Sequence, residues 1–86
     1  MKWRLADHLA WQMIGDEAVV IDLRSGTAIG LNKSATLIWT LLANTDDAEI
    51  CTEVSKKFAV EAERAASDLR EFTSLLSSRG LLFEAS

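Results

Sequence analysis

The side chains that could do chemistry in this sequence are a lone histidine, a lone cysteine and a pair of aspartates. His8 could act as a general base and Cys51 as a nucleophile, but no motif places a partner beside either one. His8 is therefore interpreted as a surface strand residue, and Cys51 as a buried structural thiol on an apolar helix face. Asp46 and Asp47 could bind a cation, yet acids at a helix start explain them better. We expect no enzyme, no metal and no cofactor.

Composition and charge limit the function classes further. Eighty-six residues, of which 49% are hydrophobic, predict one small domain over residues 1–86. A single cysteine fits a reducing compartment, and no apolar run has the length of a signal-peptide core or of a membrane span. We therefore expect a cytoplasmic protein without a membrane partner. The net charge of −4, with only nine scattered Lys and Arg, disfavours nucleic-acid binding.

Alternating apolar residues predict a three-stranded antiparallel meander. Its strands are expected at residues 8–13, at Ala18–Leu23 and at Thr27–Leu31. The third strand, T-A-I-G-L, is uncharged and carries the small residues Ala28 and Gly30 on one face. A short, flat strand of this kind at a sheet edge invites another chain to pair with it.

The apolar pattern also predicts how the strands pair. A three-residue loop at 15–17 keeps one face apolar, whereas a two-residue turn at Gly15-Asp16 would mix the two faces. A second three-residue loop, at 24–26, follows the same reasoning, with Gly26 in the left-handed position. The expected pairs are Met13 with Val19, Trp11 with Ile21, Leu9 with Leu23, Ile21 with Ile29, and Val19 with Leu31.

Helical periodicity begins after Asn32, which is a good N-cap. The three expected helices run from the Asn32 cap to Asn44, from the Thr45 cap to a break at Ala59-Val60, and from about Glu61 to Gly80. Trp11 and Trp39 are expected in the core, and Trp3 as an exposed contact.

The third helix has small apolar residues first and large ones later. Alanines such as Ala65 and Ala66 precede Leu69, Phe72 and Leu75. If this helix lies beside the third strand, the two could border an apolar groove. The pattern fits close packing of helices equally well. After Gly80, residues 81–83 continue as an extended apolar tail.

Several motifs together give the chain a family resemblance. They are D-L-R-S-G-T-A-I-G-L-N at 22–32, S-A-T-L-I-W-T-L-L at 34–42, S-D-L-R-E-F at 67–72 and S-S-R-G-L-L at 77–82. As a set they resemble the PqqD-like family, the peptide chaperones or leader-recognition elements of ribosomally made and modified peptides. The G-L-N form and the chain length look most like the stand-alone leader-binding subunit of lasso peptide systems.

The resemblance implies a fold and a binding mode. The implied fold is α+β, a three-stranded antiparallel sheet followed by three helices, similar to a winged helix-turn-helix. The leader peptide would join the sheet against the third strand and pack on the third helix, while a separate enzyme does the chemistry. Carried over by motif, the peptide-binding residues are Thr27, Ala28, Ile29, Gly30 and Leu31 on the strand and Ala65, Asp68, Leu69, Phe72 and Leu75 on the helix. Thr73 stands where the family usually has an aliphatic residue.

These observations favour a binding module over a catalyst. We expect a domain that binds the leader segment of a precursor peptide and presents it to a maturation enzyme such as a leader peptidase. One alternative is a winged-helix DNA-binding regulatory module, and another is a structural domain that dimerises through the same edge strand. The predicted second helix argues against reading DNA, because Asp47, Glu49 and Glu53 outweigh Lys56 and Lys57.

Overall fold

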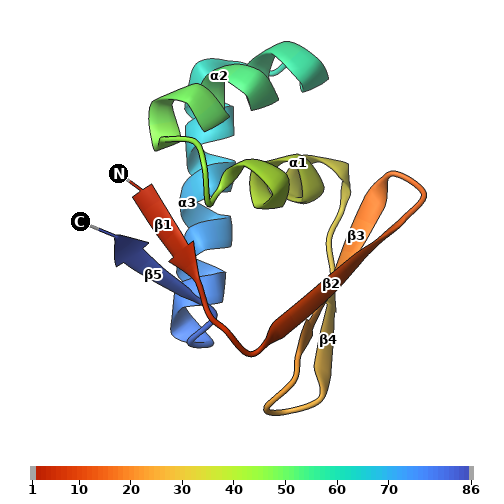
Figure 1. Cartoon of the computed structure of the whole chain (residues 1–86). Coiled ribbons are helices and arrows are strands. Elements are labelled where there is room, and N and C mark those ends of the chain that lie inside the picture. The colour runs from red at the N-terminus through yellow and green to blue at the C-terminus, as the bar shows by residue number, and fades with distance from the viewer. Residues whose placement is uncertain (1, 86) are drawn as a thin grey trace.

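Two antiparallel sheets and three helices make up residues 2–85, the part of the chain that the computed structural model describes (Figure 1). The elements are β1 (Lys2–Leu5), β2 (Leu9–Ile14), β3 (Glu17–Asp22), β4 (Thr27–Gly30), α1 (Lys33–Leu41), α2 (Asp47–Phe58), α3 (Ala62–Ser78) and β5 (Leu82–Ala85). The expected α+β class, with a three-stranded antiparallel sheet and three helices, is confirmed. The strand order β2-β3-β4 leaves β4 at one edge and β2 at the other.

A second, two-stranded sheet was not expected from the sequence. β1 pairs antiparallel with β5, and this brings the first and last described segments together (Figure 1). The tail after Gly80 is therefore a paired strand, and its first residues, Leu81 and Leu82, lie in the core. Trp3 on β1 is partly buried, and its Nε1 donates a hydrogen bond to Asp47 Oδ1 at 2.8 Å. The expectation of an exposed Trp3 is wrong.

Both expected strand registers are wrong by one residue. In the first hairpin Trp11 lies opposite Val20, with a two-residue loop at Gly15-Asp16. Gly15 has φ 66°, and a glycine at the first position of a two-residue loop is the type II′ preference. In the second hairpin Val20 lies opposite Ile29. The rule of keeping apolar residues on one face could not decide the register, because both faces of β3 carry apolar residues.

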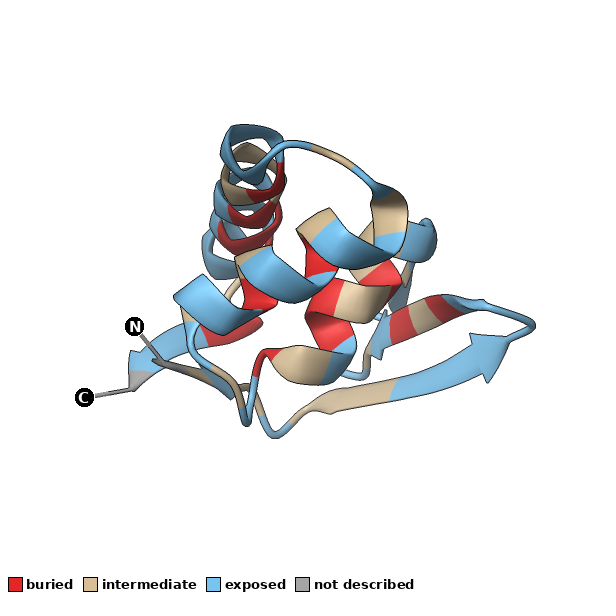
Figure 2. Cartoon of the chain, turned by 90° about the horizontal axis from the view of Figure 1, so that it is seen from above, coloured by how far each residue is buried: buried red, intermediate tan, exposed pale blue. Residues whose placement is uncertain are grey.

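The inner face of β3 carries small residues because α1 comes close to it. Ala18 and Val20 are buried, and the Ala18 N–H donates to Thr36 Oγ1 on α1 at 2.9 Å. Ile21 and Val19 point to the opposite face of the sheet, which the helices do not cover (Figure 2). Successive side chains of β3 point to opposite faces of the sheet, and both sets are apolar. One set lies on the face that the helices cover, and the other set lies on the open face.

Local capping signals set the helix boundaries. Asn32 is the N-cap of α1, and its Oδ1 accepts from the Ala35 N–H at 2.9 Å, as expected. Asp46, rather than Thr45, caps α2 and accepts from the Glu49 N–H at 3.0 Å. Gly80, with φ 71°, follows the end of α3. The expected end of the first helix at Asn44 is too late, since α1 ends at Leu41.

The helices pack around one apolar core (Figure 2). Its most deeply buried large side chains are Ile38, Leu42, Ile50, Leu76, Leu81, Leu82, Val20 and Val54. Trp39 is buried, as expected, but Trp11 is 47% exposed and contacts Trp39 edge-to-face with ring centroids 6.1 Å apart. No helix among residues 2–85 is long and apolar enough to cross a membrane.

Candidate functional site

The free edge of β4 is the first part of the candidate site. The Leu31 N–H donates to Ala18 O at 2.8 Å, so the backbone of Leu31 faces β3. Hydrogen-bonding direction alternates along an antiparallel pair. The N–H and C=O groups of Ala28 and Gly30 therefore point away from β3, towards the open edge. Gly30 has space around it, since a Cβ added there would meet nothing within 4 Å.

The five strand residues expected to bind a peptide are not equally available. Thr27, Ala28 and Gly30 are exposed, and Ile29 is partly buried. Leu31 lies beyond the end of β4 and is buried in the core. The open edge therefore offers the backbone groups of Ala28 and Gly30, while the buried Leu31 side chain fixes the end of the strand to the core.

A cavity of about 320 Å³ lies between the start of α1 and the middle of α3. Ile38, Phe72 and Leu75 supply its apolar surface, and Asp68 and Glu71 supply acidic groups. Its full lining is Asn32, Ser34, Ala35, Ile38, Arg64, Asp68, Glu71, Phe72 and Leu75. Because Asn32 follows β4 after a single residue, the cavity opens close to the end of the edge strand.

The α3 residues expected in the site divide into two groups. Ala65 has no exposed surface, and Leu69 is also buried, so these two side chains face the core rather than the cavity. Asp68, Phe72 and Leu75 line the cavity, and Leu75 is 41% exposed. The apolar groove was expected between the third strand and the alanines of the third helix. The cavity instead lies on the Asp68 side of that helix. Thr73 is buried, and its hydroxyl donates to Leu69 O at 2.9 Å.

Four polar cavity residues, Asn32, Ser34, Arg64 and Glu71, were not assigned to the site from the sequence. Arg64 and Glu71 lie seven residues apart on α3, two helical turns, which places them on one face with Asp68. That spacing was a usable signal. Nothing local in the sequence indicates that Asn32 lies across from them, because this depends on how α1 packs against α3.

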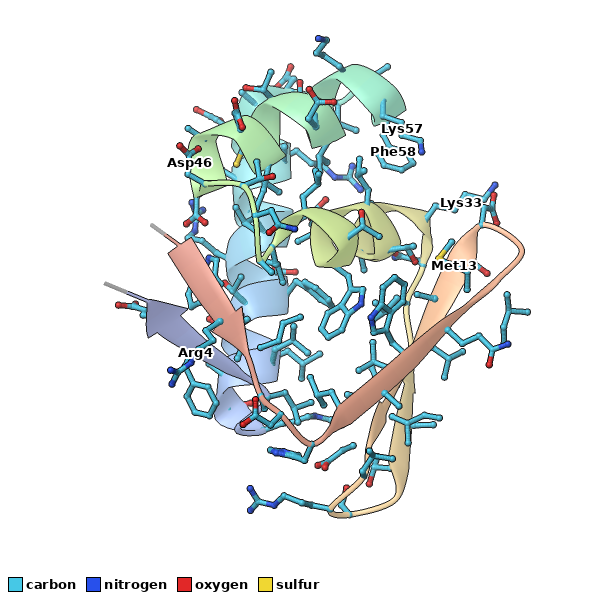
Figure 3. The ribbon with its side chains drawn as sticks, in the orientation of Figure 1. Arg4, Met13, Lys33, Asp46, Lys57 and Phe58 are labelled. Atoms are coloured by element: carbon cyan, nitrogen blue, oxygen red, sulfur yellow. The ribbon has the colours of Figure 1, made fainter. Side chains whose placement is uncertain are left out.

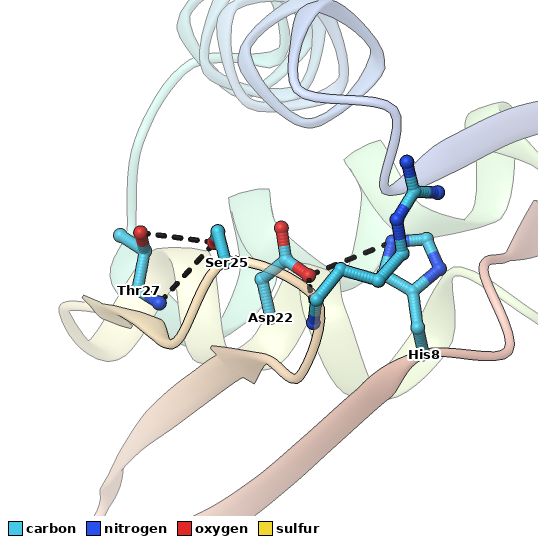
Figure 4. Close-up of polar contacts among 5 residues, drawn as sticks. His8, Asp22, Ser25 and Thr27 are labelled. Carbon is cyan, nitrogen blue, oxygen red and sulfur yellow. Dashed lines mark hydrogen bonds and ion pairs between the residues drawn. The ribbon is translucent and has the colours of Figure 1, made fainter.

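The β3–β4 turn is ordered by side chains at its base (Figure 4). The Arg24 backbone N–H donates to Asp22 Oδ1 at 2.9 Å and, as the largest cause, lowers the pKa of Asp22 below its ordinary value. His8 Nε2 lies 3.7 Å from the same oxygen. The Thr27 N–H donates to Ser25 Oγ at 3.2 Å. His8 is thus a partner of the turn that leads into β4.

Cys51, which was expected to be a buried thiol, is partly buried. Burial raises the pKa of its thiol, and nearby Asp47 raises it further, although Arg70 opposes the shift. A thiol with a raised pKa is a poor nucleophile at neutral pH. Within residues 2–85, no group of three or more His, Cys, Asp or Glu side chains is arranged to hold a metal ion.

Comparison with solved structures shows close similarity in fold. "TbiB1 in Complex with the TbiA(beta) Leader Peptide" is 30% identical, with a TM-score of 0.85 over 100% of this chain and 99% of that one. "Lasso peptide synthetase B1 complexed with the leader peptide" is 22% identical, with a TM-score of 0.84 over 98% of this chain and 100% of that one. At that identity the second likeness concerns the fold alone.

Comparison at the level of sequence gives the family. No curated protein matches this sequence. The profile of the family described as "Coenzyme PQQ synthesis protein D (PqqD)" matches residues 17–82, which include β4, α1 and α3 and so every element of the candidate site. The match covers well over half of the chain, and the 30% identical structure spans all of it. The chain therefore belongs to the PqqD family.

Proposed function

We propose that this protein binds the leader segment of a precursor peptide as an added strand on β4 and presents it to a separate maturation enzyme. The observation that carries the proposal is the 30% identical structure, TbiB1, which was captured in complex with a leader peptide. The geometry of this chain supports the same use, because the outward backbone groups of Ala28 and Gly30 are free to pair with an extended peptide.

The cavity beside β4 supplies the second part of the proposed binding mode. Each backbone hydrogen bond contributes about 1 kcal/mol net of its exchange with water, whereas ordering a flexible leader costs about 2–5 kcal/mol. A strand as short as β4 therefore needs apolar side chains as anchors. Phe72 and Leu75 give such side chains a surface, and Asp68 and Glu71 suit a basic or polar leader group next to them.

The wider proposal concerns shape, location and chemistry. Residues 1–86 form one recognition domain, similar in arrangement to a winged helix-turn-helix, and act in the cytoplasm. The protein leaves the chemistry to its partner enzyme. The DNA-binding alternative receives no support from the acidic faces of α2 and α3, and we do not favour it.

Gly30 provides the direct test of strand addition. Gly30→Pro removes an N–H that faces the open edge and puts a ring in the path of the added strand. We expect at least tenfold weaker binding of the leader peptide of the cognate precursor, measured by calorimetry. Gly30→Ala is the matched control, since it keeps the N–H and its Cβ meets nothing within 4 Å. It should bind as the unsubstituted protein does.

A proline in the central strand separates folding from binding. Val19→Pro removes a hydrogen bond between β3 and β2 and is expected to unfold the domain in a thermal melt. Gly30→Pro should keep a cooperative melt. If folded Gly30→Pro bound the leader with the affinity of Gly30→Ala, strand addition on β4 would be wrong.

A further inference from the structure

The sheet has a second free edge, at β2. This strand reads L-A-W-Q-M-I and carries no charged residue. Trp11, Met13 and Ile14 are 47%, 42% and 65% exposed. Edge strands are usually protected from pairing by charges, prolines or bulges. A six-residue edge without any charge or proline is therefore suited to receiving a strand.

The backbone of β2 is oriented for such pairing. The Leu23 N–H donates to His8 O at 2.8 Å, which makes His8 a residue whose backbone faces β3. By alternation, Ala10 and Gln12 also face β3, and the N–H and C=O groups of Leu9, Trp11 and Met13 face the open edge. Three residues thus present unused donors and acceptors along this edge.

A cavity of about 200 Å³ adjoins the Met13 end of the strand. It lies between the β2–β3 hairpin, α1 and the end of α2, where Figure 3 shows Met13, Lys33, Lys57 and Phe58 on the same side of the molecule. Its lining is Met13, Asp16, Lys33, Thr36, Leu37, Thr40, Lys57 and Phe58. Apolar cavities of about 150 Å³ admit a benzene ring, so one leucine or phenylalanine side chain fits here.

Charge at this cavity differs from the acidic character of the whole chain. Lys33 Nζ pairs with Asp16 Oδ2 at 3.2 Å. Lys57 instead lies with its ammonium 6.0 Å from the centre of the Phe58 ring, and within residues 2–85 no carboxylate oxygen lies within 4.0 Å of it. In a protein of net charge −4, a lysine without an acidic partner beside an apolar cavity favours an incoming carboxylate.

We propose that β2 and this cavity are a second docking site, which takes an extended segment of the enzyme that processes the leader-bound precursor. The segment pairs with β2, places an apolar side chain between Met13 and Phe58, and sets a carboxylate beside Lys57. This inference rests on the proposed function, because it names the surface through which the leader is presented.

The same observations argue against a second copy of this chain as the occupant. Self-pairing along β2 would place the strand Leu9–Ile14 of the second copy on this edge, and that strand contains no carboxylate. The leader is also excluded as the occupant in the proposed arrangement, since it lies on β4. With strands about 4.8 Å apart, the two edges are separated by about 10 Å, so leader and enzyme can bind the same sheet together.

The test measures binding of the processing enzyme to the full chain by calorimetry. Met13→Lys puts a charge in the apolar part of the site, and Lys57→Glu reverses the charge at its rim. We expect both to raise the Kd for the enzyme at least tenfold. Thr52→Lys, on the exposed side of α2, and Lys56→Glu, next to Lys57 but outside the cavity, are the matched controls and should stay within twofold.

Hydrogen exchange distinguishes strand pairing from a simple apolar contact. Addition of the enzyme should slow exchange of the amides of Leu9, Trp11 and Met13, which face the open edge. The amides of Ala10 and Gln12, already bonded to β3, should change little. Slowing at β4 alone would overturn the proposal.

The remaining outcomes separate this inference from the proposed function. If the enzyme does not bind, or if Met13→Lys binds it as Thr52→Lys does, the β2 site is wrong while leader binding stands. If sedimentation shows a dimer that Met13→Lys dissociates, the occupant is a second copy and the proposal fails. All four variants should bind the leader with unchanged affinity, and loss of leader binding by the unsubstituted chain would instead overturn the proposed function.

Discussion

Ala65 lies where α3 meets the core and has no exposed surface. Ala65→Trp is expected to overpack the core and lower the free energy of unfolding by about 1–3 kcal/mol or more, rather than fill a binding groove. Ala62→Trp is the matched control at an exposed position of the same helix and should change stability by less than about 0.5 kcal/mol. Thermal melting compares the two. If Ala65→Trp and Ala62→Trp melted at the same temperature, Ala65 would not be a core residue and would line the peptide-binding groove.

Asp22 should make the β3–β4 turn sensitive to acid. Its pKa lies below the ordinary value of 3.8, chiefly because the Arg24 N–H donates to the carboxylate. Because the pKa of Asp22 is lower in the folded state than in the unfolded state, the ionised carboxylate stabilises the fold above pH 3.8. That stabilisation is lost as the pH falls through the pKa of the folded state. Asp22→Asn should therefore lower Tm at pH 7, and the difference should shrink below pH 3.8. A difference that stays constant across the titration would contradict the role of the carboxylate.

At the level of elements, local signals predicted the fold better than long-range ones did. The Asn32 cap and the Gly80 stop were found because each depends on a few neighbouring residues. Both registers were displaced because both faces of β3 are apolar and only the approach of α1 to Ala18 distinguishes them. Trp11 lies on the helix-covered face, opposite Val20 and against Trp39, but it stays 47% exposed because β2 is an edge strand. The β1–β5 pair was missed because its strands have four residues each and lie at opposite ends of the sequence.

Substitutions of Leu75 and Leu76, neighbours near the end of α3, should have different effects, one on leader binding and the other on stability. Leu75 is 41% exposed and lines the cavity beside β4, whereas Leu76 is fully buried. Leu75→Ala should weaken leader binding about fivefold, because about 1 kcal/mol of apolar burial on binding is lost. Leu76→Ala should instead lower the free energy of unfolding by about 2–5 kcal/mol.

Calorimetry with the leader peptide and denaturant unfolding of each variant measure the two effects. Leu75→Ala should unfold close to the unsubstituted protein. If Leu75→Ala left leader affinity unchanged while Phe72→Ala reduced it, the peptide would cross the cavity nearer the middle of α3, and Leu75 would be removed from the proposed site.

At the scale of the whole molecule, the site combines one feature visible in the sequence with one that is not. The edge strand could be recognised because T-A-I-G is short, uncharged and rich in small residues. The cavity could not, because it requires Asn32 and Ser34 to meet α3 residues 30 or more positions later in the chain. Burial then decides which α3 side chains are available, and it removes Ala65 and Leu69 from the exposed wall.

Charge over the whole molecule predicts the absence of useful DNA affinity. The chain carries 13 Asp and Glu against nine Lys and Arg, and two of these acids, Asp68 and Glu71, lie with the single base Arg64 on the cavity face of α3. Affinity for duplex DNA comes largely from neutralising phosphates, and at physiological salt even non-specific binders reach only about 10⁻⁴–10⁻⁶ M. We expect this chain to bind more weakly than that range in a fluorescence titration with a labelled duplex. Leader binding in the same buffer is the positive control. Submicromolar, salt-sensitive binding to any duplex would favour a DNA-binding role and weaken the assignment of β4 to a peptide.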